Sequence, residues 1–353
     1  MAVLRPAGEF DTSYARDLAT IRQPWQWVLL FGFILALYTL PFYTSQSTVA
    51  LVNRIGLTLI AVQGLNLVTG LTGQISLGQA AFMTTGGYFS ALLVGQLGWP
   101  FLAALPAAAL GAGVVGLIFG LPSLRVKGFY LVMATLGAQF IIPWFTRNAF
   151  QDVLNGAQGL NVPPPVVFGL EFNTPARYLY LTLTVMLFST LAAYNISRSR
   201  LGRAFVSIRD NDLAAELLGI HLFKYKLLAF FLAAVYAGAA GALWAHNLRH
   251  INSETFNLAD SIFLLGMLVM GGLGTNLGAV LGAGVGMLLI EGATLFGPFF
   301  GSLFPAAAGA VQALRPLFFG TTLMLFLIFE PRGLAHRWQL LKAGWRLRPF
   351  SHT

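Results

Sequence analysis

The chain has 353 residues, of which 57% are hydrophobic and only 9% are charged, and its mean hydropathy is +0.73. Soluble domains carry roughly 25% charged residues, so the composition excludes an ordinary soluble domain and indicates a polytopic membrane protein. The net charge is +9, but Lys and Arg gather at the ends of apolar runs, as positive-inside topology predicts. We therefore expect no nucleic-acid partner. The lack of cysteine excludes disulfides, thiolate metal sites and a cysteine nucleophile.

Residues 1–24 form a mixed polar segment without the basic start, short apolar core and small-residue cleavage site of a signal peptide. We expect this segment to be a cytoplasmic N-terminal tail. A membrane domain should follow over residues 25–330, and residues 331–353 should form a cytoplasmic C-terminal tail.

Ten segments are apolar enough to be candidate spans, each of which needs about 20 mostly apolar residues. They are Trp25–Tyr43, Thr48–Thr69, Leu77–Leu97, Phe101–Leu121, Phe129–Phe145, Arg177–Asn195, Tyr225–His246, Ala259–Gly274, Leu277–Phe296 and Leu314–Glu330. We expect the eighth or ninth to be broken or short. The predicted fold is all-α, with about ten transmembrane helices.

The basic segments test this topology, because they should face the cytoplasm. With ten spans and an internal N-terminus, residues 125–127, 198–226 and 332–348 all fall on the cytoplasmic side. On the outer side, residues 147–176 form the longest connection, which is either a surface for an external partner or an ordinary loop.

Two glycine-rich stretches, Gly70–Tyr88 and Met270–Ala279, interrupt the apolar pattern. Polar groups at the membrane edge are costly unless they are buried in protein or line an aqueous path. Both a translocation path and tight packing with turn chemistry fit, and both can hold at once. The candidate path residues are Asn66, Gln74, Ser76 and Gln79, together with the ionisable Arg54 and Glu291. An Arg54–Glu291 pair is one option, and for the amides we favour interhelical hydrogen bonding.

The longest charged interruption, residues 197–226, has the pattern of a short surface helix. Asp210 or Asp212 is the expected N-cap, and Gly219 should end the helix in a left-handed conformation. Leu213, Leu217 and Leu218 form an apolar stripe at helical spacing. Because so short a helix is marginal alone in water, we expect it to rest on another protein. Lipid headgroups are the alternative.

Several motifs of catalysis are missing from the sequence. It has no phosphate-binding P-loop, no H-E-x-x-H motif or other metal-ligand spacing of histidines, and no G-x-S-x-G nucleophile elbow. We therefore expect no metal, no cofactor and no enzymatic activity. A transporter body whose energy source lies on another chain fits best.

Five motifs in order resemble the branched-chain amino-acid permeases of bacterial ABC importers, LivM type. They are Gly70–Phe82, Gly120–Leu131, Arg200–Ile220, Met270–Thr275 and Phe329–Leu334. The resemblance extends from about Thr48 to Leu334 and does not cover the N-terminal tail. It implies an ABC-importer permease fold in the bacterial cytoplasmic (inner) membrane, and substrate movement by alternating access.

The resemblance also implies the partners: a second permease subunit of LivH type, two cytoplasmic ATP-binding subunits, and a periplasmic or tethered substrate-binding protein. The charged loop would be the coupling helix that docks on an ATPase subunit. Its site residues would be Asp210, Asp212, Ala214, Ala215, Glu216 and Gly219. The family motif E-A-A-x-x-x-G appears here with Leu213 in place of Glu, which puts a Glu-specific contact in doubt but not the docking role.

Three other functions stay open. A permease of the same family for urea or another small amide would look much alike. An ion-coupled secondary transporter would need no ATPase subunits. A membrane-embedded enzyme would need clustered carboxylates or histidines within the spans, and Glu291 alone is too little.

Overall fold

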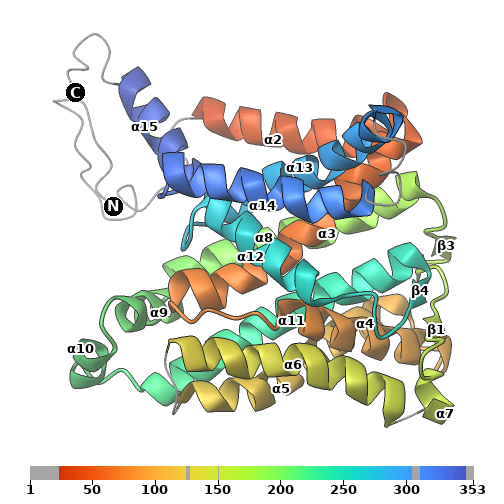
Figure 1. The fold of residues 1–353 in the computed structure, drawn as a ribbon, viewed down its shortest axis with the longest axis horizontal. Coiled ribbons are helices and arrows are strands. Elements are labelled where there is room, and N and C mark those ends of the chain that lie inside the picture. The colour runs from red at the N-terminus through yellow and green to blue at the C-terminus, as the bar shows by residue number, and fades with distance from the viewer. Residues whose placement is uncertain (1–23, 125–127, 150, 304–310, 347–353) are drawn as a thin grey trace.

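The computed structural model describes residues 24–124, 128–149, 151–303 and 311–346. Most helices run along the long axis of the molecule as a bundle (Figure 1). The long helices are α2 (Pro24–Thr39), α3 (Gln46–Leu65), α4 (Gln79–Gly95), α5 (Phe101–Gly120), α6 (Phe129–Asn148), α8 (Pro175–Arg198), α11 (Leu222–Leu248), α12 (Leu258–Gly271), α13 (Asn276–Leu303) and α14 (Val311–Phe329). A helix thus lies at each of the ten predicted spans, which confirms the all-α prediction.

Shorter elements connect these helices. They are η1 (Leu40–Phe42), the π-helical turn η2 (Asn66–Leu71), η3 (Leu121–Leu124), α7 (Gln151–Leu154), α9 (Arg200–Asp210), α10 (Asp212–Leu217) and α15 (Leu334–Arg346). Two antiparallel two-residue ladders pair β1 (Leu160–Asn161) with β4 (His250–Ile251) and β2 (Val166–Val167) with β3 (Leu170–Glu171).

The helices differ in how far they can reach across a bilayer. Within the described residues, five segments are long and apolar enough to cross alone: 25–42, 46–71, 101–120, 175–198 and 222–248. The eighth predicted span, α12, has only 14 residues and rises about 21 Å, against a hydrocarbon core of about 30 Å. The ninth, α13, has 28 residues. Short α12 therefore needs protein around its ends.

Helix α11 lies at the centre and packs against α3, α4 and α5. Small residues permit this close approach, as in membrane bundles generally. A Cβ atom on Gly241 of α11 would lie 2.6 Å from the carbonyl carbon of Met83 in α4. By contrast, α2 packs mainly against α8, and its Trp25, Trp27 and Phe31 are exposed, as expected of a lipid-facing helix at the periphery.

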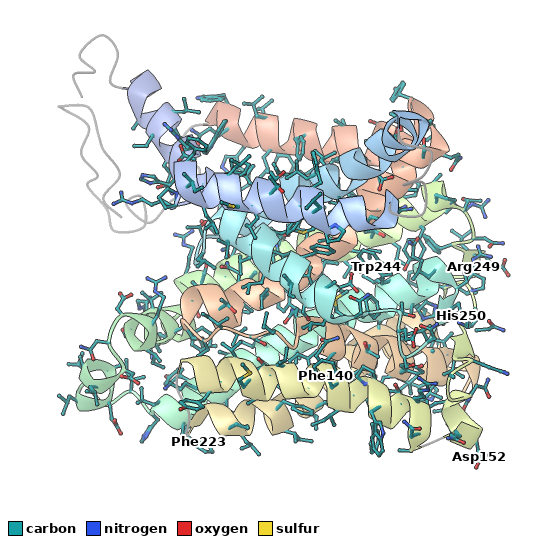
Figure 2. All side chains as sticks on the ribbon, in the orientation of Figure 1. Phe140, Asp152, Phe223, Trp244, Arg249 and His250 are labelled. Atoms are coloured by element: carbon teal, nitrogen blue, oxygen red, sulfur yellow. The ribbon has the colours of Figure 1, made fainter. Side chains whose placement is uncertain are left out.

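The two ends of the bundle carry different segments. Helices α9, α10 and α15 lie at one end, and β1, β3, β4 and α7 lie at the other (Figure 1). Figure 2 places Phe223 at the first end, and Asp152, Arg249 and His250 at the second. The described segments with a basic pattern are thus separated from those predicted to face outward. That the first end faces the cytoplasm stays a prediction from the charges.

Candidate coupling and translocation site

The predicted translocation residues surround a break between α3 and α4. Helix α3 continues as the π-helical turn Asn66–Leu71, and an irregular segment over residues 72–78 leads to α4. The first N–H groups of a helix have no partner within it. At α4 they are capped by other helices, because Ala80 N donates to Ser261 Oγ (2.9 Å) and Ala81 N to Gln139 Oε1 (3.0 Å). The break is therefore held in place by α6 and α12.

Ser76 and Gln79 are almost fully buried at this break. Ser76 Oγ accepts a hydrogen bond from Gly78 N at 3.3 Å, and Gln79 Nε2 donates to the carbonyl of Ala61 at 2.9 Å. Gln79 Oε1 has no hydrogen-bond partner among the described residues. Both side chains thus belong to the local framework, while the free oxygen of Gln79 leaves one acceptor inside the bundle.

Asn66 joins the two glycine-rich stretches. Its Oδ1 accepts from Gly274 N at 2.9 Å, and its Nδ2 donates to the carbonyl of Thr275 at 3.3 Å. The backbones touch here, since a Cβ on Gly70 would lie 2.5 Å from Gly274 N, and Gly274 itself has φ +75°. The sequence alone does not relate the two stretches, and the structure places them against each other.

Arg209, at the end of α9, connects this contact to the charged loop. Its Nη1 donates to the carbonyl of Gly70 at 3.1 Å, and its Nη2 lies 3.0 Å from Asp210 Oδ1. A Cβ on Gly274 would lie 2.7 Å from the same Nη1. We call Asn66, Gly70, Arg209 and Gly274 the break junction. It links the proposed coupling segment directly to the interrupted helices.

The N-terminus of α10 corrects one prediction. Asn211, and neither Asp210 nor Asp212, caps the helix: its Oδ1 accepts from Ala214 N at 3.1 Å. Asn211 has the extended backbone that a cap requires (φ −160°, ψ 107°), whereas Asp210 still belongs to α9 and Asp212 is already helical. Asp212 Oδ2 instead lies 3.6 Å from Lys226 Nζ, next to the partial positive charge of the helix N-terminus.

The C-terminus of α10 confirms the prediction for Gly219. This residue has φ +85°, Gly219 N donates to Glu216 O at 2.9 Å, and Ile220 N donates to Ala215 O at 3.0 Å. These are the two bonds of a Schellman cap. The side chain of Glu216 is exposed. A helix of only 6 residues is thus fixed at both ends.

The surface of α10 is unusually apolar. Leu213, Leu217 and Leu218 are 66%, 89% and 81% exposed. Ala214 is exposed as well, but Ala215 is only 1% exposed and faces the protein. Ala215 therefore seats the helix on the bundle, and the three leucines, which we call the leucine face, point outward.

Arg54 and Glu291 form the pair considered from the sequence, with Nη1 and Oε2 3.1 Å apart. Both side chains are partly exposed, and the pair joins α3 to α13. Arg54 lies about 18 Å along the helix from Asn66, at 1.5 Å per residue. The pair is therefore separate from the break junction.

Gln74 lines a cavity of about 390 Å³ between the break and the charged loop. The residue is 7% exposed, and both of its side-chain amide atoms are buried without a hydrogen-bond partner among the described residues. Arg209, Asp210, Asp212 and Lys226 line the same cavity. The structure thus brings Gln74 together with the predicted coupling residues, which lie far away in the sequence.

Two contributors escaped prediction. Arg209 belongs to the charged run Arg209–Asp212. At the level of the sequence, its charge served only as evidence that this loop faces the cytoplasm. Ser261 gave no signal, because a serine near a helix start is common, and its bond to Ala80 joins residues 181 positions apart.

Comparisons with known proteins agree with this architecture. A family model described as "Branched-chain amino acid transport system / permease component" matches residues 47–327. The high-affinity branched-chain amino acid transport system permease protein LivM of Escherichia coli K12 is 30% identical over 344 residues, covering 91% of this chain and 76% of the relative. The autoinducer 2 import system permease protein LsrC of Enterobacter sp. strain 638 is 26% identical over 269 residues, covering 72% of this chain and 73% of LsrC.

Among solved structures, PsaBC from Streptococcus pneumoniae in complex with Fab has a TM-score of 0.42 and 14% identity, covering 89% of this chain and 99% of the matched chain. The family match and the LivM similarity both extend over most of the sequence. The chain therefore belongs to the family of branched-chain amino acid transport system permease components.

Proposed function

We propose that this chain is the permease subunit of an ATP-driven importer for branched-chain amino acids of the leucine, isoleucine and valine type. Family membership and the name of its LivM relative support this substrate class. The relatives LivM and LsrC are named as permease proteins of transport systems, so we expect this chain itself to catalyse no reaction. A second permease, two ATP-binding subunits and a substrate-binding protein would complete the importer in the inner membrane.

One observation carries the coupling mechanism: the leucine face lies on the same short segment, α9–α10, as Arg209 of the break junction. Leu217 and Leu218 are exposed on α10, while Arg209, at the end of the adjoining α9, bonds to Gly70 at the break. An ATPase subunit that covers the leucine face can therefore move the glycine-rich break through Arg209. A partner can change which side the permease opens to only if it binds one conformation more tightly than the other.

In the proposed cycle, this connection would support alternating access. When nucleotide draws two ATPase subunits together, α9 and α10 move with them, and the movement reaches the contact between Gly70 and Gly274. The cavity between the two permeases then changes the side to which it opens. Asn66, Ser76 and Gln79 would lie beside this path, and Arg54–Glu291 would join two of its helices elsewhere.

Reconstitution tests the substrate class and the energy source together. The chain is assembled with the partner permease, two ATPase subunits and the binding protein in proteoliposomes, and uptake of ¹⁴C-leucine is measured. We expect uptake with ATP, competition by isoleucine and valine, and no competition by urea. Uptake driven by a sodium or proton gradient without ATP would favour a secondary transporter. Competition by urea would favour the amide permease, and the LsrC similarity makes autoinducer 2 a third competitor to test.

Docking of the leucine face is tested by Leu217→Arg. Leu217 is 89% exposed in the subunit, so the change should leave the fold intact but place a charge in the apolar contact. Loss of such an anchor costs about 1–3 kcal/mol, or roughly 5- to 150-fold in affinity, so much less of the ATPase subunits should co-purify. Leu170→Arg, in an exposed leucine at the other end of the bundle, is the control. Equal co-purification in both variants would reject docking at α10.

A further inference from the structure

Helix α15 presents large apolar side chains at its surface. Leu334, Trp338 and Leu341 follow the i, i+4 and i+7 spacing that places residues on one face of a helix. Trp338 is 56% exposed and Leu341 is 63% exposed, whereas Ala335 is buried against the bundle. We call Leu334, Trp338 and Leu341 the α15 stripe. The described part of the chain leaves most of this stripe uncovered.

Basic residues border the α15 stripe. Arg337 and Lys342 are exposed, and at 3.6 residues per turn they fall on its two edges. An apolar face with tryptophan and leucine, bordered by lysine and arginine, is typical of a helix that lies in the membrane interface and is attracted to anionic lipids. We propose that α15 lies at the level of the lipid headgroups and binds anionic phospholipid. The inference goes beyond the proposed function, because it needs neither cargo nor ATP.

The charge of this part of the chain suits an anionic partner. Residues 330–353 contain five Lys and Arg residues and one acidic residue, Glu330. Glu330 Oε1 accepts a hydrogen bond from Arg337 Nε, so one of the five positive charges is already paired within the chain. Residues 1–23 hold three arginines and three acidic residues, and their side-chain charges cancel. An anionic headgroup would therefore meet an excess of positive charge beside α15.

The fold continues a lipid-facing surface into the α15 stripe. Helix α14 ends at Phe329, and Leu325, Ile328 and Phe329 near this end are exposed, as expected of a membrane helix that faces lipid. Helix α15 begins five residues further on, at Leu334, after a bend of 45°. The apolar surface thus passes from α14 to α15. A phospholipid whose acyl chains lie beside α14 can place its headgroup beside α15.

The base of α15 is fixed to the bundle, so the direction of the stripe is fixed as well. Gly333 has φ +78°, and a Cβ there would lie 2.6 Å from Gly272 Cα. A Cβ on Gly272 would in turn lie 3.5 Å from the Cβ of Ala335. Small residues thus bring α15 against the second glycine-rich stretch, while Trp338 and Leu341 stay exposed.

The headgroup region fits α15 better than the hydrocarbon core does. By length and composition, α14 and α15 together could also form one bent span. However, α15 carries Arg337, Lys342 and Arg346 among its 13 residues, and such charges in hydrocarbon are costly. At about 20 Å in length, the helix can instead lie along the interface, where tryptophan is enriched.

Lipid contact can be measured in the full chain, placed in nanodiscs with the subunits that co-purify with it. Because the sequence has no cysteine, Leu341→Cys carries a single NBD fluorophore. Gln339→Cys is the matched control, since Gln339 is also exposed but lies on the opposite face of α15. Lipid brominated near the headgroup end of its acyl chains quenches fluorophores at that depth. In an equal mixture of phosphatidylcholine and phosphatidylglycerol, we expect at least threefold stronger quenching at position 341 than at position 339.

A second comparison tests the preference for anionic lipid. In phosphatidylcholine alone, the excess quenching at position 341 should fall at least twofold. Arg332→Gln combined with Lys342→Gln should cause the same loss in the lipid mixture, because both residues are exposed and both charges are removed. Arg147→Gln combined with Arg177→Gln changes two exposed arginines at the other end of the bundle, and it should leave the excess unchanged.

Three results would overturn the proposal. Equal quenching at positions 341 and 339 would mean that the stripe faces water or another protein, such as an ATPase subunit. Stronger quenching by lipid brominated near the ends of its acyl chains would place α15 in a bent span. An excess at position 341 that is the same in both lipid compositions would reject the anionic ligand. None of these results bears on ATP-driven import of leucine, so the two proposals can fail separately.

Discussion

At the scale of single residues, glycine sets how closely the central helices pack. A Cβ on Gly241 would lie 2.6 Å from the Met83 carbonyl carbon, whereas a Cβ on Gly284 in α13 meets nothing within 4 Å. Gly→Ala in a helix gains about 0.5–1 kcal/mol from backbone entropy, while overpacking costs about 1–3 kcal/mol or more. We therefore expect Gly241→Ala to lower the thermal unfolding midpoint in detergent, and Gly284→Ala to leave it equal or higher.

Gly241→Ala and Gly284→Ala add the same methyl group within a membrane helix. A difference between their unfolding midpoints therefore reports the packing around each glycine. Equal midpoints for the two variants would show that α4 and α11 can separate freely, against the close contact in the structure. Uptake should follow stability in Gly241→Ala, since α4 and α11 flank the break.

The polar residues near the break fall into two groups that the sequence could not distinguish: those with a hydrogen-bond partner and those without one among the described residues. Asn66, Gln79 and Gln139 each form a hydrogen bond to another helix or loop, which supports interhelical bonding for the amides. Which residues they meet could not be predicted, because the partners lie 18 to 209 positions away. Gln74 was placed on the candidate path, and its lack of a described partner emerges only from the three-dimensional packing.

At the scale of elements, α10 depends on its caps, and Gly219 tests this. The residue has φ +85°, and a Cβ there would meet no atom within 4 Å, so backbone strain alone decides the effect of substitution. A β-branched residue in this conformation costs about 1–3 kcal/mol, whereas asparagine tolerates it. We expect Gly219→Val to reduce ATP-driven leucine uptake at least tenfold and Gly219→Asn to retain most of it.

Membrane insertion and subunit yield should be equal in both Gly219 variants, because the residue is exposed in the connection between α10 and α11. Equal uptake would mean that the end of α10 has no part in coupling. Loss of uptake in both variants would point to a contact that requires the bare glycine backbone, and not to the left-handed cap.

The sequence predicted α10 with its glycine end but misplaced its start. Three candidate caps stand in a row, Asp210, Asn211 and Asp212, and all three residue types cap helices well. The choice depends on where α9 ends, and this is set by burial of Phe205 and Ile208 against the bundle. The inward position of Ala215 has the same origin, because helical periodicity defines a stripe but not which side another helix covers.

At the scale of the whole molecule, the ten apolar segments were predictable because each carries its own hydropathy signal, and all ten are helices. The length of α12 and the π-helical turn after α3 were harder to predict. They depend on protein that surrounds polar backbone inside the membrane, such as the Ser261 and Gln139 caps on α4. The sequence of a helix does not indicate which residues of other helices will surround its ends.

The separation of the two ends predicts the orientation in the membrane, and the cysteine-free chain allows a direct test. Glu216→Cys lies on α10, and Phe168→Cys replaces a residue that is 92% exposed beside the β2–β3 ladder. Because neither variant has a background thiol, each reports one position. The positive-inside rule assigns the α10 end to the cytoplasm.

A membrane-impermeant maleimide should therefore label Phe168→Cys on intact spheroplasts and Glu216→Cys on inside-out vesicles, with little signal in the opposite preparations. The assembled importer should weaken the Glu216→Cys signal further, because an ATPase subunit on the leucine face would cover the adjacent thiol. Labelling of both positions from the same side would contradict the ten-span topology. Labelling of Glu216→Cys from outside would also reject coupling through α10, since no cytoplasmic ATPase could reach it.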